Sequence, residues 1–82
     1  MSSVPRFHFH IVDGTALTDT DGLELPDTAA AKSEAIRLAG AVLKDYIGDD
    51  LWRGEPWQIV VNDSQVPNTG RTYFNLTLTA TE

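Results

Sequence analysis

The sequence contains no cysteine. Disulfide bonds, thiolate nucleophiles and zinc sites built on cysteine are therefore excluded together. The six glycines are scattered along the chain, and they form neither a GxGxxG pattern nor a P-loop. Because such loops are what cradle the phosphates of nucleotides, no nucleotide cofactor is expected.

Basic residues are scarce. Six lysines and arginines stand against twelve aspartates and glutamates, which gives a net charge of -6. A field of that sign repels nucleic-acid phosphates and anionic lipids. No apolar run approaches the ~18 residues that span a bilayer, and the first residues lack the apolar stretch of a secretion signal. We therefore expect a cytoplasmic protein with no nucleic-acid partner and no membrane partner.

Catalytic patterns are missing as well. No serine lies in a GxSxG context, and the paired Asp49 and Asp50 lie in a loop, where they are expected to be solvated. Without a nucleophile and base at a recognisable spacing, the sequence assigns no catalytic residue and does not favour an enzyme.

A helix is predicted from residue 28 to residue 47. Pro26 favours an extended residue before it, and Asp27 is a good N-cap. Gly48 is a natural stop for the helix. Apolar residues follow at spacings of three and four: Ala35, Ile36, Ala39, Val42, Leu43, Tyr46 and Ile47.

Alternating apolar and polar residues predict strands at 6–12, 57–62 and 72–80. The turn dipeptide Asp13-Gly14 is expected to lead into a further short strand at 16–18. One helix and four strands make a two-layer ββαββ domain of the α+β class, covering residues 1–82.

Two strand orders fit this element sequence. The aromatic and aliphatic content of 6–12 and 72–80 favours a mixed, β-grasp-like sheet of order 2-1-4-3, counted along the chain. If the first strand pairs with the third, the sheet is wholly antiparallel. A core of this size would be modest, so pairing with a second copy would stabilise the chain.

The stretch DTDG, residues 19–22 with Thr20 between the aspartates, suggests a calcium loop. With Gly22 at the sixth position of an EF-hand loop, Leu17 falls at the first position and Thr28 at the twelfth. Both positions should carry carboxylates, so a polar turn ahead of the helix is the better interpretation.

His8 and His10 project from the same face of the first strand and are a candidate pair of metal ligands. Two imidazoles do not complete a site, and nothing in the spacing supplies a third ligand. We therefore assign no metal.

The sheet face turned away from the helix mixes hydrogen-bonding and apolar groups, which suits a partner surface. The predicted function is a small interaction or accessory domain that acts through this face or through an edge strand, with a protein partner or a second copy. The alternative is a small-molecule or metal-binding protein centred on the histidines. The candidate binding residues are His8, His10, Gln58, Val60, Tyr73 and Asn75.

Two motifs also carry a family resemblance. The strand RFHFHIVDG and the segment DTDGLELPDTAAAKSEA resemble an uncharacterised bacterial family of short alphaproteobacterial proteins, whose pattern is Asp-x-x-Gly-x-Glu-Leu-Pro-Asp before an alanine-rich helix. The matching residues are Arg6, Phe7, Phe9, His10, Asp13, Gly14, Asp19, Gly22, Glu24, Leu25, Pro26, Asp27, Ala30, Glu34 and Ala35.

The resemblance extends to Trp57, Val61, Asp63 and the strand after Arg71. The chain departs from the family in two places: His8 stands where an aromatic residue is usual, and the connection between the last two strands is longer. The resemblance implies a shared fold unit and no known activity.

Overall fold

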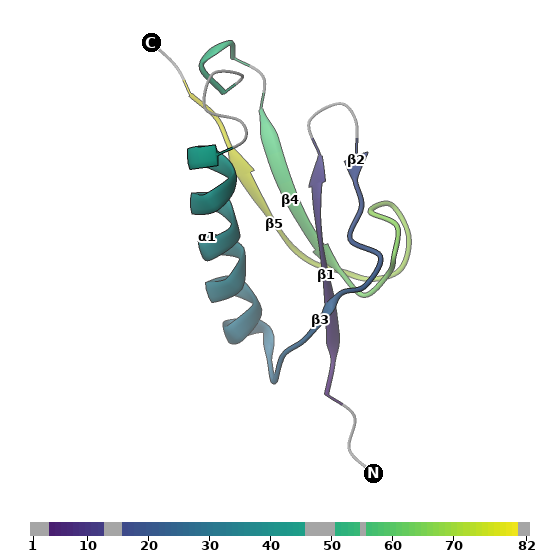
Figure 1. Cartoon of the computed structure of the whole chain (residues 1–82). Coiled ribbons are helices and arrows are strands. Elements are labelled where there is room, and N and C mark those ends of the chain that lie inside the picture. Colours follow the sequence, from purple (N-terminus) through teal and green to yellow (C-terminus); the bar gives the residue numbers. More distant parts are fainter. Residues whose placement is uncertain (1–3, 13–15, 46–50, 55, 81–82) are drawn as a thin grey trace.

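The computed structural model describes residues 4–12, 16–45, 51–54 and 56–80 of the chain (Figure 1). Helix α1 (Thr28–Asp45) lies on one face of a sheet that contains β1 (Arg6–Val12), β2 (Ala16–Leu17), β3 (Leu23–Glu24), β4 (Trp57–Asn62) and β5 (Thr72–Leu78). The α+β class and the two-layer arrangement are confirmed. Within the described part of the chain, no helix combines the length and the apolar content needed to cross a membrane.

The sheet has the order β2-β1-β4-β5, and all of its strand pairs are antiparallel. The wholly antiparallel alternative is thus confirmed, and the mixed order that the sequence favoured is wrong. The reason lies in β4, whose Trp57, Ile59 and Val61 are only 4%, 1% and 0% exposed. β1 and β4 each carry four buried side chains and β5 carries none, so β1 and β4 lie side by side at the centre of the sheet and β5 lies at the edge.

The outer edge of β1 is paired at both of its ends. β2 pairs with Ile11 and Val12, and β3 pairs with Arg6 and Phe7. The two-residue β3 is not predicted by the sequence pattern. Between β2 and β3 the chain leaves the edge, and this departure positions the polar network described below. The predicted Asp13-Gly14 turn lies outside the described residues.

Helix α1 begins as predicted. The Asp27 carboxylate accepts a hydrogen bond from the backbone N–H of Ala30 at 2.9 Å, so Asp27 is the N-cap. The predicted final residues, Tyr46 and Ile47, lie outside the described part of the chain, in which α1 ends at Asp45. Ile36 was predicted to face the core, but it is 63% exposed, because it lies on the flank of α1 rather than on the buried side.

The core lies between α1 and the sheet. Buried alanines of α1 meet aromatic and branched side chains of β1 and β4, and the short alanine side chains let the helix approach the sheet closely. The residues of this cluster are Phe7, Phe9, Ala31, Ala35, Ala39, Ile59 and Val61. Near the last turns of α1, Val42 and Trp57 form a second, smaller cluster.

Candidate functional site

The two histidines of β1 are buried, although the sequence placed them among the candidate binding residues of an open sheet face. His8 is 5% exposed and His10 is fully buried. They project from the sheet face opposite α1, and their rings are stacked, with centroids 6.1 Å apart and an interplanar angle of 6°. The segment between β2 and β3 shields them, because Asp19 in that segment bonds to both rings.

Asp19 makes four hydrogen bonds, of which three connect this segment to β1 and one lies within the segment. Its carboxylate accepts the N–H of Phe9 at 3.0 Å and the N–H of Gly22 at 3.1 Å. Its backbone carbonyl accepts a hydrogen bond from His8 Nδ1 at 2.7 Å, and its N–H donates to His10 Nδ1 at 3.0 Å. The Phe9 N–H, which points outward between the positions paired with β2 and β3, is thereby satisfied by a side chain.

The backbone N–H and carbonyl of Asp19 fix whether Nδ1 carries a proton on each of the two imidazoles. A backbone N–H can only donate, so Nδ1 of His10 must be an unprotonated acceptor and the proton lies on Nε2. A carbonyl can only accept, so Nδ1 of His8 carries a proton. His10 is therefore neutral in this arrangement, and its Nε2–H donates to Asn62 Oδ1 at 2.9 Å and to the Ser64 carbonyl at 3.0 Å.

Asn62, at the end of β4, is fully buried and organises the loop that follows. Its Oδ1 also accepts the N–H of Ser64 at 3.2 Å. Its Nδ2 donates to the carbonyls of Val66, Pro67 and Thr69 at 2.9, 3.3 and 3.2 Å. His8, His10, Asp19 and Asn62, here called the Asp19 network, thus link β1, the β2–β3 segment and the β4–β5 connection.

Gly22 is required by this packing. Its φ is +71°, and a Cβ atom there would lie 2.8 Å from Arg6 Cγ and 2.9 Å from His8 Cε1. Any other residue would be strained in its backbone and would also displace the side chains beneath it. The Arg6 guanidinium donates to the Asp21 carbonyl at 2.8 Å and to the Glu24 carboxylate at 2.6 Å, which holds the segment over β1.

These contacts give the DTDG motif and the histidines structural roles. Both carboxylate oxygens of Asp19 and both ring nitrogens of His10 already have partners. In the described ranges, no group of three or more His, Cys, Asp or Glu side chains is placed to hold a metal ion. The interpretation of DTDG as a turn ahead of the helix agrees with the Asp19–Gly22 hydrogen bond.

The other candidate face residues separate into two groups. His10 pairs with Val60, and Val60 pairs with Asn75, so these three cross the sheet in one row, with Gln58 further along β4. Tyr73 does not join them. The register of β4 and β5 shifts between Val61 and Asn62, and the Tyr73 ring lies 4.7 Å from that of Phe7, against the core. The irregularity turns Tyr73 to the helix side, so its predicted place on the open face is wrong.

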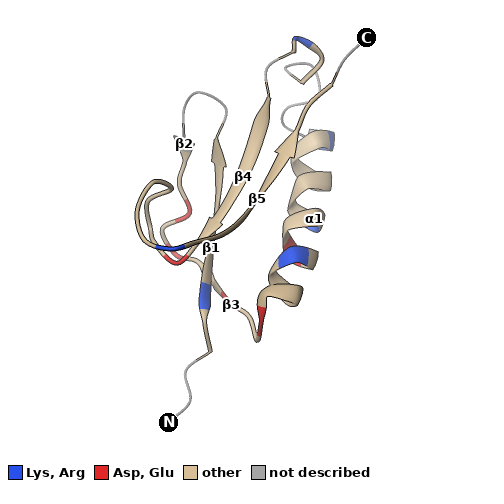
Figure 2. Cartoon of the chain, turned by 180° about the vertical axis from the view of Figure 1, so that it is seen from behind, with Lys and Arg blue, Asp and Glu red and all other residues tan. Residues whose placement is uncertain are grey.

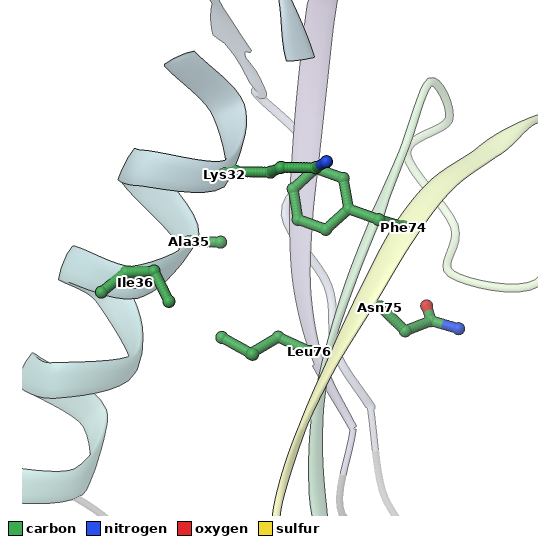
Figure 3. A pocket seen from close by; sticks show the side chains of 6 residues that line it. All are labelled: Lys32, Ala35, Ile36, Phe74, Asn75 and Leu76. Carbon is green, nitrogen blue, oxygen red and sulfur yellow. The ribbon is translucent and has the colours of Figure 1, made fainter. Parts of the chain in front are cut away.

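On the other side of the sheet, β5 is an edge strand, and a groove separates it from α1 (Figure 3). The groove has a volume of about 280 Å³. In Figure 3 the side chains of Ile36 and Leu76 point toward each other across it, whereas Asn75 points away. We call it the α1–β5 groove; its lining residues are Lys32, Ala35, Ile36, Phe74, Asn75 and Leu76.

A second groove of about 340 Å³ lies on the β1 side of α1. Apolar residues such as Ile11 and Leu38 line it, but so do the acidic Asp19 and Glu34. Arg37 forms an ion pair with Glu34, and its Nε donates to the Glu34 carboxylate at 2.9 Å. This hydrogen bond lowers the pKa of the Glu34 carboxyl and raises the pKa of Arg37.

The two grooves thus differ in charge. Figure 2 shows β4 and β5 free of charged residues, while acidic residues mark the segment beside β1. The sequence pattern gave no sign of either groove, because each depends on how far one helix extends across a wider sheet. Ile36 continues the apolar repeat of α1, so its exposure could not be read from the sequence either.

Residues 6–79 match the model of a family described as a domain of unknown function, DUF6894. Neither the curated proteins nor the solved structures include a significant match to the chain. The matched span runs from the start of β1 to just beyond the end of β5, so it includes the Asp19 network and the α1–β5 groove. The chain therefore belongs to the DUF6894 family.

Proposed function

We propose that this chain is a small protein-interaction domain, and that its docking surface is the outer edge of β5 together with the α1–β5 groove. The groove is the observation that carries the proposal. It places the exposed Ile36 and the apolar Phe74 and Leu76 beside a strand edge that no other described strand covers. An extended polypeptide could pair with β5 through its backbone and place alternate side chains in the groove.

The composition of β5 supports this proposal. Edge strands of monomeric proteins are commonly protected by lysine, by proline or by short length. β5 is seven residues long and contains neither a charged residue nor a proline. The edge is thus chemically open to pairing, and the proposed partner is a protein strand, from a second copy or from another protein.

The open sheet face takes a smaller part in the proposal than the sequence suggested. His8 and His10 are engaged in the Asp19 network, whereas Gln58 and Asn75 are exposed. Asn75 lies on the open face and also in β5, the strand of the proposed docking surface. It is therefore the candidate binding residue that remains central to the proposal. A cytoplasmic location and a single domain over residues 1–82 are part of the same proposal, and the acidic composition supports the absence of a nucleic-acid partner.

A peptide titration tests the docking surface. The probe is an unlabelled peptide with the β5 sequence TYFNLTL and two added lysines for solubility, and the comparison peptide has the same composition in scrambled order. We expect the first peptide to shift the backbone amide NMR signals of β5 and of the α1 turn around Ile36, with the scrambled peptide much weaker. Unchanged β5 signals, or equal shifts with both peptides, would refute the proposed docking surface.

The variant Ile36→Glu places a carboxylate in the groove without removing a buried side chain, since Ile36 is 63% exposed. It should weaken binding of the ordered peptide roughly tenfold or more, as expected when a central apolar contact is lost. Ser33→Glu adds the same charge to an exposed position of the same helix that does not line the groove. This control should bind like the unmodified chain.

A further inference from the structure

We propose that the partner at the β5 edge is a second copy of this chain, joined by antiparallel β5–β5 pairing about a two-fold axis at Asn75. This inference rests on the proposed docking surface and names its occupant. The paired strands would continue the sheet from one copy into the other, with both α1 helices on the same side.

Charge favours a second copy at this edge. Each chain carries a net charge of -6, so most surfaces of two copies repel each other. Residues 72–80 contain no charged side chain, and none of the groove-lining residues is acidic. Direct pairing of β5 with itself therefore opposes no like charges. The outer edge of β1, in contrast, is already paired at the charged Arg6 by β3, which carries the charged Glu24.

The pattern of β5 is self-complementary about its midpoint. In antiparallel pairing centred on Asn75, Phe74 lies opposite the partner's Leu76, and Leu76 lies opposite the partner's Phe74. Directly opposed residues share a sheet face, so these four apolar side chains gather on the helix side. The same register places the two Asn75 side chains side by side on the open face, where their amides can hydrogen-bond to each other.

The α1–β5 groove would be filled in this arrangement. Ile36 and Asn75 line the same groove, so the axis passes near Ile36 and brings it toward the partner's Ile36. Lys32 lies one turn before Ile36, and Gly40 lies one turn after it. The two-fold rotation sets Lys32 beside the partner's Gly40, around which a Cβ atom would find nothing within 4 Å. The one charged residue of the groove would thus meet open space rather than a second lysine.

The small core gives a reason for association. Among the residues that the structure describes, three of the nine buried apolar ones are alanines, which contribute little apolar area each. Covering Ile36, Phe74 and Leu76 would remove further apolar surface from water. The contact spans one strand of about 23 Å and one helix flank, which is at the low end of specific interfaces. The dimer should therefore dissociate on dilution.

Cross-linking tests the register, because the chain has no cysteine of its own. Asn75→Cys places one thiol at the axis, about 5 Å from its symmetry mate. Thr77→Cys places a thiol on the same exposed face. In this register the thiol is offset by four residues along the strand from the same thiol of the second copy, about 13 Å away. In a glutathione redox buffer, we expect Asn75→Cys to form a disulfide-linked dimer at least tenfold faster than Thr77→Cys. Equal rates would overturn the register.

Sedimentation analysis over a wide range of protein concentration tests the dimer itself. We expect the unmodified chain and Ser33→Glu to change from monomer to dimer with increasing concentration, and Ile36→Glu to need at least tenfold more protein. A chain that stays monomeric, or a dimer unaffected by Ile36→Glu, would overturn the inference. If the β5 peptide still binds the groove in that case, the docking surface stands and only its occupant is wrong.

Discussion

The outer edges of β1 and β5 are the two borders of the sheet, and they differ in how far other residues of the chain pair with them. β1 is covered at its ends by β2 and β3, and between them the Asp19 carboxylate accepts the Phe9 N–H. β5 has no partner strand on its outer side among the described residues. The polar Asp19 network therefore closes one edge, while the apolar α1–β5 groove leaves the other able to bind. A motif that resembles a ligand site in sequence can thus be structural, and we propose that the strand without such a motif is the binding one.

The largest expected effect comes from removing the buried amide that joins the network to the β4–β5 connection. Asn62→Ala leaves His10 Nε2 and the carbonyls of the loop without their shared partner. We expect a loss of about 3 kcal/mol or more in the free energy of unfolding, measured by urea denaturation.

Asn68→Ala, at an exposed position of the same loop, is the matched control and should change stability by less than ~0.5 kcal/mol. Equal effects of the two substitutions would mean that the network does not hold the loop.

A somewhat smaller effect is expected at the turn that covers β1. Gly22→Ala and Gly54→Ala both place a side chain at a positive φ, +71° and +90° respectively. Only Gly22 has neighbours in the way, namely Arg6 and His8. We expect about 1 kcal/mol of destabilisation for Gly54→Ala and about 2–3 kcal/mol for Gly22→Ala.

Hydrogen exchange of the Phe9 amide sharpens this comparison. It should become faster in Gly22→Ala than global destabilisation alone explains, because the segment that carries Asp19 is displaced from β1. If the Phe9 amide in Gly22→Ala keeps its protection relative to the other amides of the chain, the proposed role of Gly22 is contradicted.

The smallest effect concerns the ion pair beside the groove on the β1 side. The hydrogen bond from Arg37 lowers the pKa of Glu34 in the folded state, so its contribution to stability is present above the unfolded carboxyl pKa. The contribution is lost as the pH falls through the lowered folded pKa. Glu34→Gln should therefore destabilise the chain slightly at neutral pH, and this loss should shrink in high salt. A loss that is insensitive to both pH and salt would show that the charge is not its cause.

Local sequence signals predicted much of the fold. The Asp27 cap and the apolar repeat gave the start and the type of α1, and alternation gave β1, β4 and β5. These features depend on residues a few positions apart, which is the range over which capping and periodicity act. The strand order depends on which strand buries its side chains most deeply, and that is decided by tertiary packing.

The candidate site was less predictable for the same reason. His8 and His10 lie on the face that alternation indicates, but the segment that shields them folds back from ten residues further along. Tyr73 changes face because of one register shift in the pairing of β4 and β5, and no residue in β5 indicates that shift in the sequence. Asp19 and Gly22 belong to a recognisable sequence motif, and the turn predicted there agrees with the structure, but the motif does not indicate their contacts to β1.

The contrast between the two edges is tested most directly by amide hydrogen exchange of the unmodified chain at low and at high protein concentration. We predict that alternate amides of β5, those that point away from β4, gain protection as concentration rises. The Phe9 amide in β1 should be protected equally at both concentrations, because Asp19 of the same chain holds it. Protection of β5 that does not change with concentration, or a parallel gain in β1, would contradict the assignment of one closed edge and one binding edge.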